Sequence, residues 1–222
     1  MSPAGLVVLI SGRGSNALAI ADAVAQQRLP ARINAVIADR PADGLEAMAE
    51  RGIDTALVER AAYAKRADFE QALAEVIEGY APELIVMAGF MRVLSRDFVE
   101  RFDQRMINIH PSLLPKFRGL NTHARALADG EREHGASVHW VTCELDAGPV
   151  IANAPVAVQA DDNPVSLAAR VLKQEHRLYP ATVALLLSKP VSQRYEYFSN
   201  QKSLRLDRDF DDAGRWIQHP GG

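Results

Sequence analysis

The sequence predicts an α/β protein with a Rossmann-like fold, in which a mostly parallel central sheet has helices on both faces. Short, almost wholly apolar segments alternate with longer amphipathic ones through the first half of the chain, as strands and helices do in βαβ units. The first apolar segment ends in a glycine-rich loop over residues 12–16, and a helical pattern follows it. After about residue 105, strand-like segments follow one another without helices between them, which predicts antiparallel strands toward the C-terminal half.

The elements of the first half follow from hydrophobic periodicity. Strands are expected at residues 6–11, 32–38, 54–58 and 83–88, and helices at residues 17–27, 44–51, 64–80 and 95–102. Right-handed crossovers between parallel strands would place these helices on the two faces of the sheet.

The second half is expected to hold strands at residues 106–109, 136–143 and 150–158. Asn163 and Pro164 mark the start of a long amphipathic helix, which Pro180 is expected to kink or interrupt before residue 187. Residues 195–198 and 204–206 are expected to form a small hairpin, and residues 207–222 a loose tail. The expected organisation is one domain over residues 1–188, with halves over about 1–105 and 106–188, and an extension over residues 189–222.

Composition and charge argue against several classes of protein. The chain has 222 residues, of which 48% are hydrophobic and 24% charged, the mixture of an ordinary globular domain. Its formal net charge is -3 and its Lys and Arg residues are scattered, so no nucleic-acid partner is expected. No apolar run is long enough to cross a membrane. The single cysteine, Cys143, has no partner for a disulfide or a zinc site, so we expect a reducing, cytoplasmic location and no metal.

The loop Gly12-Arg13-Gly14-Ser15-Asn16 is a candidate phosphate site. Glycines let the backbone approach a ligand closely, and the N–H groups at the start of the following helix attract an anion. The loop lacks the Gly-Lys-Ser/Thr ending of a Walker loop and the third glycine of a dinucleotide fingerprint. The alternative is an ordinary turn in which Ser15 or Asn16 caps the helix.

Asn108, His110 and Asp146 are candidates for chemistry. Asn108 and His110 are two residues apart on an expected strand, so their side chains point to the same side. Asp146 lies in a loop between two expected strands, a common place for catalytic residues. Each has a structural alternative: a hydrogen-bonded Asn and His at a strand end, and a turn over residues 146–149.

Five segments of the chain have a pattern that occurs together in a known family. They are SGRGSN at residues 11–16, AGFMRVLS at 88–95, NIHPSLLPKFRG at 108–119, HWVTCELDAGPVI at 139–151 and QEHRLYP at 174–180. In this order and register, from about residue 5 to residue 187, the chain resembles the glycinamide ribonucleotide formyltransferase family. The resemblance implies transfer of a formyl group from 10-formyltetrahydrofolate, used as a cosubstrate, to the amine of phosphoribosylglycinamide in purine biosynthesis.

The resemblance also implies a role for each matching position. The catalytic residues would be Asn108, His110 and Asp146. The substrate would be bound through its phosphate by Gly14, Ser15 and Asn16, and at its glycinamide end by Leu172, Lys173, Gln174 and Glu175, with Glu175 at the amine. The folate would contact Arg66, Met91, Arg92, Val93, Leu94 and Asn108, and its pterin would lie against Thr142, Cys143, Glu144, Leu145 and Asp146. The expected partners are thus two small molecules, and a homodimer is one alternative for the assembly.

Three positions depart from the family pattern. Arg13 stands where Asn is familiar, Cys143 replaces a more usual acidic residue, and Arg118 stands where Pro often follows the aromatic residue. None belongs to the catalytic set.

In the implied mechanism the Asn108 amide donates to a developing oxyanion and a protonated His110 adds a charged donor, while Asp146 favours the imidazolium and relays a proton.

Two related families with the same three residues are alternatives, methionyl-tRNA formyltransferase and formyltetrahydrofolate deformylase. About 35 residues follow Leu187, fewer than the RNA-binding domain of the first would need. The glycine loop begins at Gly12, where the deformylase would have a regulatory domain ahead of it. A noncatalytic nucleotide- or folate-binding module is the alternative from another class, since a fold does not fix a function.

Overall fold

The computed structural model describes residues 3–212 and 214–217, and the chain divides into two compact units, Met1–Asn108 and Ile109–Gly222. The first unit has neighbouring strands in the order β3-β2-β1-β4-β5, and every pair of neighbours is parallel. The strands are β1 (Ala4–Ile10), β2 (Ala31–Ala38), β3 (Thr55–Leu57), β4 (Leu84–Met87) and β5 (Met106–His110), whose last two residues belong to the second unit. The parallel arrangement predicted for this half is confirmed.

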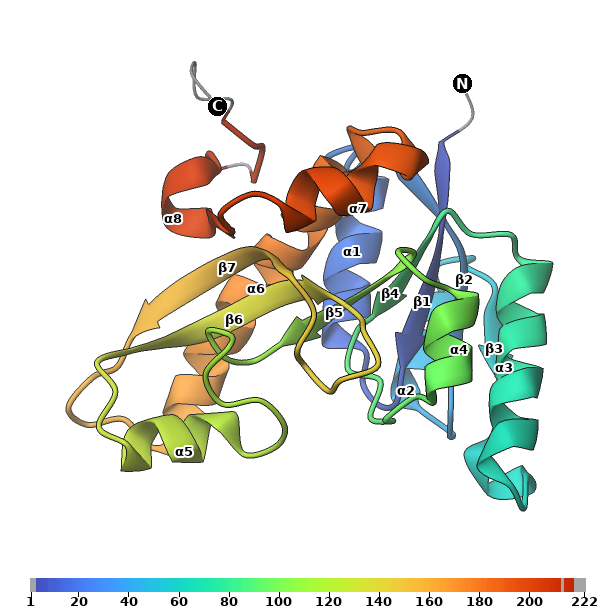
Figure 1. Ribbon diagram of the computed structural model, residues 1–222, viewed down its shortest axis with the longest axis horizontal. Helices are drawn as coiled ribbons and strands as arrows, with labels where there is room; N and C mark the ends of the chain where they lie inside the picture. Colours follow the sequence, from blue (N-terminus) through green and yellow to red (C-terminus); the bar gives the residue numbers. More distant parts are fainter. Residues whose placement is uncertain (1–2, 213, 218–222) are drawn as a thin grey trace. The chain divides into compact units, whose positions relative to one another are not determined.

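The helices of the first unit cover both faces of these strands. They are α1 (Ser15–Ala25), α2 (Asp43–Ala49), the single 3-10 turn η1 (Arg60–Ala62), α3 (Arg66–Gly79) and α4 (Arg96–Arg101). Helix α1 packs against α2 and β2, and α3 packs against α4 on the other face (Figure 1). Because helices cover both faces, the five side chains from Leu6 to Ile10 are all fully buried. Burial on both faces is why β1 appears in the sequence as an unbroken apolar run.

The second unit contains the antiparallel strands predicted for the C-terminal half. Strands β6 (Glu133–Trp140) and β7 (Val150–Ala157) pair antiparallel, and the short β8 (Leu204–Arg205) pairs with β7 in the parallel sense. The helices are α5 (Thr122–Ala128), α6 (Pro164–Leu187), α7 (Val191–Ser199) and α8 (Leu206–Asp209). Helix α6 packs along β6 and β7 and also contacts α5. The fold is therefore a mixed α/β fold, as predicted.

The interruption expected at Pro180 does not occur. Helix α6 begins as predicted, with the Asn163 side chain accepting hydrogen bonds from the backbone of Val165 and Ser166, and it continues through Pro180 to Leu187. Proline removes one helical hydrogen bond. The residues around it are buried, and this packing outweighs the local preference of the proline.

The hairpin predicted in the C-terminal extension is wrong. Residues 195–198 belong to helix α7, in which Arg194 and Phe198 are buried at a spacing of one helical turn. The second expected strand exists as β8, but it pairs with β7. Within the expected loose tail, α8 is a short helix and Phe210 pairs with Trp216, while residues 213 and 218–222 lie outside the described residues. No helix among residues 3–212 and 214–217 has the length and apolarity that a membrane span needs.

Candidate active site

The glycine loop that follows β1 leads directly into helix α1. Gly14 is the N-cap residue and has a left-handed backbone, with φ 66°, which glycine adopts without strain. In the described part of the chain no side chain caps this helix, so the alternative in which Ser15 or Asn16 acts as an ordinary cap is wrong. Ser15 and Asn16 are instead the first residues of the 11-residue α1, where backbone N–H groups attract an anion.

The start of helix α2 holds the glycine loop in place. Gly44 N donates a hydrogen bond to Gly12 O over 3.3 Å. A Cβ atom on Gly44 would lie 2.6 Å from Ile10 Cδ1 and 2.8 Å from Gly12 O, distances that no real side chain tolerates. Glycine at position 44 is therefore required for this contact, and sequence analysis did not connect it with the loop.

The segment Met91–Leu94, expected beside folate, lies between β4 and α4 and contacts the residue that precedes the glycine loop. Met91 N donates to Ser11 Oγ over 2.8 Å. Arg92 Nε lies 2.5 Å from a carboxylate oxygen of the buried Asp39. Met91 and Val93 are large apolar residues, yet they are 65% and 61% exposed. The first unit thus brings the expected phosphate and folate residues close to one another.

Arg66, also expected beside folate, is the first residue of α3 and pairs with Glu70. Its Nε lies 2.7 Å from Glu70 Oε1, and the same carboxylate accepts hydrogen bonds from the backbone and hydroxyl of Ser95. Ser95 is the N-cap of α4 and immediately follows Leu94. Arg66 is therefore connected, through Glu70 and Ser95, to the end of the Met91–Leu94 segment.

Asn108 and His110 lie on β5, two residues apart, so that strand geometry directs both side chains to the same side of the strand. Asn108 is partly exposed and stands opposite Met87 in the parallel ladder between β4 and β5. His110 is the last residue of the strand and is buried. Asn108 and His110 are thus the two polar residues of this strand, and its other three residues are apolar and buried.

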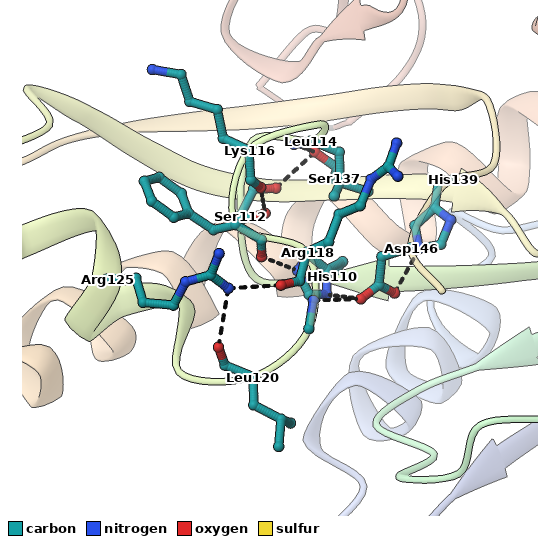
Figure 2. Close-up of polar contacts among 12 residues, drawn as sticks. His110, Ser112, Leu114, Lys116, Arg118, Leu120, Arg125, Ser137, His139 and Asp146 are labelled. Atoms are coloured by element: carbon teal, nitrogen blue, oxygen red, sulfur yellow. Dashed lines mark hydrogen bonds and ion pairs between the residues drawn. The ribbon is translucent and has the colours of Figure 1, made fainter. Parts of the chain in front are cut away.

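His110 and Asp146 face each other at the centre of Figure 2. His110 Nδ1 lies 3.3 Å from Asp146 Oδ2, and both side chains are nearly buried, at 7% and 8% exposure. His110 Nε2 lies 2.9 Å from the backbone oxygen of Phe117. A carboxylate and a carbonyl can only accept hydrogen bonds, so an imidazolium, which has two N–H groups, satisfies both partners at once.

The backbone around this pair is held in unusual conformations. Asp146 has φ 50° and Phe117 has φ 55°, both in the left-handed region. Aspartate visits this region more readily than most residues, whereas an aromatic residue there is strained. Asp146 Oδ2 also accepts a hydrogen bond from Gly119 N over 3.0 Å, which ties the loop of Asp146 to the loop of Phe117. Such conformations gather at functional sites.

His139 is a residue of this site that sequence analysis missed. It lies on β6, its Nε2 is 3.7 Å from Asp146 Oδ1, and its Nδ1 is 2.9 Å from the backbone oxygen of Trp140. Burial lowers the pKa of His139 below its ordinary value, although the Trp140 carbonyl and the Asp146 carboxylate oppose this shift. A neutral His139 donates its Nδ1–H to Trp140, so its Nε2 presents an acceptor toward Asp146. The only signal in the sequence was a histidine shortly before the loop of Asp146.

The remaining predicted residues of the second unit lie on a loop and a helix. Thr142 to Asp146 form part of the loop between β6 and β7, where Thr142 Oγ1 donates to Glu144 O over 3.2 Å and Leu145 is exposed. Leu172 to Glu175 lie within α6, and Glu175 is buried one turn before Tyr179. Burial, with a smaller contribution from Glu175, raises the pKa of Tyr179 well above its ordinary value. Within the described residues, no group of three or more His, Cys, Asp or Glu side chains could hold a metal ion.

Comparisons of the sequence and of the structure with known proteins both identify the same family. Residues 4–183 match the formyl transferase family. The phosphoribosylglycinamide formyltransferase of Escherichia coli K12 is 47% identical over 180 residues, which are 81% of this chain and 85% of that protein. The structure of the phosphoribosylglycinamide formyltransferase of Coxiella burnetii is 49% identical and superimposes with a TM-score of 0.79, covering 82% of this chain and 86% of that one. A formyltetrahydrofolate deformylase from Pseudomonas putida is 26% identical with a TM-score of 0.76, covering 85% of this chain and 66% of that one.

Proposed function

Since this chain belongs to the formyl transferase family, we propose that Asn108, His110 and Asp146 catalyse the reaction of its phosphoribosylglycinamide formyltransferase relatives. In that reaction the chain transfers a formyl group from a formyltetrahydrofolate cosubstrate to the amine of phosphoribosylglycinamide, a step of purine biosynthesis. The observation that best supports the assignment of residues is the buried contact of 3.3 Å between His110 and Asp146, next to two left-handed residues. A turn residue alone would need no buried imidazole as its partner.

Asn108 stabilises the oxyanion. The substrate amine attacks the formyl carbon, and the carbonyl oxygen takes up negative charge as the tetrahedral intermediate forms. A side-chain amide on a rigid strand can donate to that oxygen without reorganising. Asn108 meets this requirement because it lies within β5 and is partly exposed.

His110 supplies a second, charged donor. Its Nδ1 lies 3.3 Å from Asp146 Oδ2, and its Nε2 lies 2.9 Å from the Phe117 carbonyl oxygen. The developing oxyanion is a stronger acceptor for a cationic donor than a neutral carbonyl, so it can replace Phe117 O at Nε2 as the reaction proceeds. The proposal therefore includes a small displacement of the loop at Phe117 when both substrates are bound.

Asp146 moves the proton. The attacking nitrogen must lose a proton, and the departing folate nitrogen must gain one as its bond to the formyl carbon breaks. A carboxylate placed between two imidazoles, 3.3 Å from His110 and 3.7 Å from His139, can accept this proton and return it, directly or through water. No covalent intermediate on the enzyme is needed.

The remaining residues bind and orient the two substrates. Gly14, Ser15 and Asn16 bind the phosphate at the start of α1, and Leu172, Lys173, Gln174 and Glu175 bind the glycinamide end. Arg66, Met91, Arg92, Val93 and Leu94 bind the folate together with the loop Thr142, Cys143, Glu144 and Leu145. Holding both reactants in this way makes the attack effectively intramolecular. We place the reaction in the cytoplasm, where the exposed Cys143 would remain reduced.

One assay separates this function from its alternatives. The full chain is incubated with 10-formyltetrahydrofolate and phosphoribosylglycinamide while the folate absorbance is followed, and we expect a change that requires both substrates. A change without the amine would indicate a deformylase, to which the chain has a weaker resemblance. No change with either mixture would contradict the proposal and favour a noncatalytic binding module.

A further inference from the structure

Asp39 is a fully buried carboxylate just beyond the C-terminal end of β2. The residue is 1% exposed, and its side chain is 0% exposed. A buried charge is destabilising unless charged and hydrogen-bonding partners surround it. The partners of Asp39 therefore indicate what the structure gains from a carboxylate at this position.

Three side chains contact the Asp39 carboxylate. Arg92 Nε lies 2.5 Å from Oδ2, and Arg40 lies 3.2 Å from Oδ2 and 3.4 Å from Oδ1. The Ser11 hydroxyl is the third partner, since as a hydrogen-bond donor it lowers the pKa of the carboxylate. Burial alone would raise the pKa of Asp39, but the Ser11 hydroxyl and the Arg40 and Arg92 guanidinium groups outweigh it, so the pKa lies below its ordinary value. Asp39 is thus an ionised anchor for two arginines and one serine.

Two of these partners connect Asp39 to consecutive residues of the Met91–Leu94 segment. Arg92 contacts the carboxylate directly. Met91 is connected through Ser11: Ser11 Oγ accepts a hydrogen bond from Met91 N at 2.8 Å, and the same hydroxyl lowers the pKa of Asp39, for which it has a proton to donate. One carboxylate therefore fixes both the backbone of Met91 and the side chain of Arg92.

The segment depends on such anchors because it has no regular structure of its own. Residues 91–95 belong to neither a helix nor a strand, and the Met91 and Val93 side chains are largely exposed. Ser11 directly precedes the glycine loop, and its own N–H donates to Gly89 O over 3.1 Å. The position of the segment relative to the glycine loop is therefore set by contacts that meet at Ser11 and Asp39.

We propose that Asp39 is a positioning residue for the folate cosubstrate, which fixes the Met91–Leu94 segment against Ser11 and the start of the glycine loop. It does not touch either substrate. This inference rests on the proposed function only in so far as that function places folate beside Met91–Leu94. It goes beyond that function because Asp39 was not among the predicted site residues.

The test uses Asp39→Asn in the full chain, which keeps the shape of the side chain and removes its charge. Hydrogen–deuterium exchange of a peptide covering residues 89–95 measures the anchoring without any substrate. Calorimetric titration with tetrahydrofolate measures folate binding without turnover. We expect faster exchange in this peptide and a rise of about tenfold or more in the Kd for tetrahydrofolate, as hydrogen bonds to a charged group are lost. With saturating folate, kcat should change little.

A matched variant controls for the loss of an arginine–carboxylate pair as such. Glu78→Gln removes the partner of Arg101, whose Nη2 lies 2.6 Å from Glu78 Oε2 on the exposed surface of the same unit. It should change neither the exchange of residues 89–95 nor the Kd. Arg92→Gln should raise the Kd by itself but add little to Asp39→Asn, because residues that act as a unit are not additive.

The outcomes separate this inference from the proposed function. Unchanged exchange of residues 89–95 in Asp39→Asn would overturn the anchoring, whatever the enzyme catalyses. Faster exchange with an unchanged Kd would overturn the role in folate binding. Wild-type chain that binds tetrahydrofolate but transfers no formyl group would contradict the proposed function, while a weaker Kd in Asp39→Asn would still support the positioning role.

Discussion

Asn108 is a polar residue on a strand whose other side chains are buried, and its predicted catalytic role concerns the transition state. Asn108→Ala should lower kcat about 10²- to 10³-fold, the usual effect of removing one oxyanion donor. KM for phosphoribosylglycinamide should change little, because the oxyanion donor interacts with charge that develops during the reaction. Steady-state kinetics with both substrates would measure this. Asn153 lies on β7 and donates to Ser203 Oγ over 3.2 Å; Asn153→Ala removes this bond, is the matched control and should keep its kcat.

Asp146→Asn tests whether the charge of Asp146 matters or only its shape. The amide oxygen can still accept from Gly119 N, so the loop should keep its conformation and the melting temperature should stay close to that of the wild type. We expect kcat to fall by roughly 10²- to 10⁴-fold, the range for a lost proton-transfer group. Measuring kcat and melting temperature on the same variant distinguishes a loss of charge from a loss of folded structure. Full turnover in Asp146→Asn would show that Asp146 is a turn residue, as its composition alone would allow.

The contact between α2 and the glycine loop predicts a selective effect on the phosphorylated substrate. Gly44→Ala would place a Cβ 2.8 Å from Gly12 O, so the loop must shift. We expect KM for phosphoribosylglycinamide to rise by roughly tenfold, since small displacements of binding groups are costly. Gly79→Ala is the control, because a Cβ on Gly79, at the end of α3, would meet nothing within 4 Å. Equal KM values for the two variants would contradict a role of Gly44 in shaping the phosphate site.

Elements buried on both faces could be predicted from the sequence, and elements with a weak apolar pattern could not. The run from Leu6 to Ile10 indicates a strand because every side chain in it is buried. Helix α7 has no clear helical pattern of apolar residues, because one of its two buried residues is Arg194, and part of its sequence therefore predicts a strand of a hairpin. Helix α5 lies in a segment for which the sequence predicts no element, and only two of its seven residues are buried.

The candidate site likewise contains some arrangements that the sequence predicts and others that it does not. Asn108 and His110 could be placed on one side of a strand because that relation is local. The approach of His139 to Asp146 depends on the turn between β6 and β7, and the contact of His110 with Phe117 O depends on a left-handed residue. Asp39 next to Arg40 looks like a surface charge pair in the sequence. Its burial follows from tertiary packing, which hydrophobic periodicity does not describe.

Buried histidines should make the stability of the whole molecule depend on pH. Burial lowers the pKa of four histidines below the ordinary value: His123, His134, His139 and His176. Burial, reinforced by the neighbouring His123 imidazole, lowers the pKa of His134 to about 4. A group whose pKa is lower in the folded state binds its proton more readily when unfolded. Its contribution to stability is therefore complete above the unfolded pKa of 6.5 and is lost as the pH falls toward about 4.

The prediction is that the free energy of unfolding falls steadily between pH 6.5 and pH 4, and that His134 alone accounts for roughly 3 kcal/mol of this loss. His134 Nε2 lies 3.1 Å from His123 Nδ1, so one of these two nitrogens donates a hydrogen bond and the other accepts it. When both rings are protonated neither nitrogen can accept, and this contact between α5 and β6 is lost. Urea unfolding at several pH values, with wild type and His134→Gln, would measure the effect. The variant should be less stable at pH 7.5 but should lose less stability on acidification. Parallel pH profiles for the two proteins would show that the acid sensitivity arises elsewhere, first of all from His139, whose imidazole is also buried.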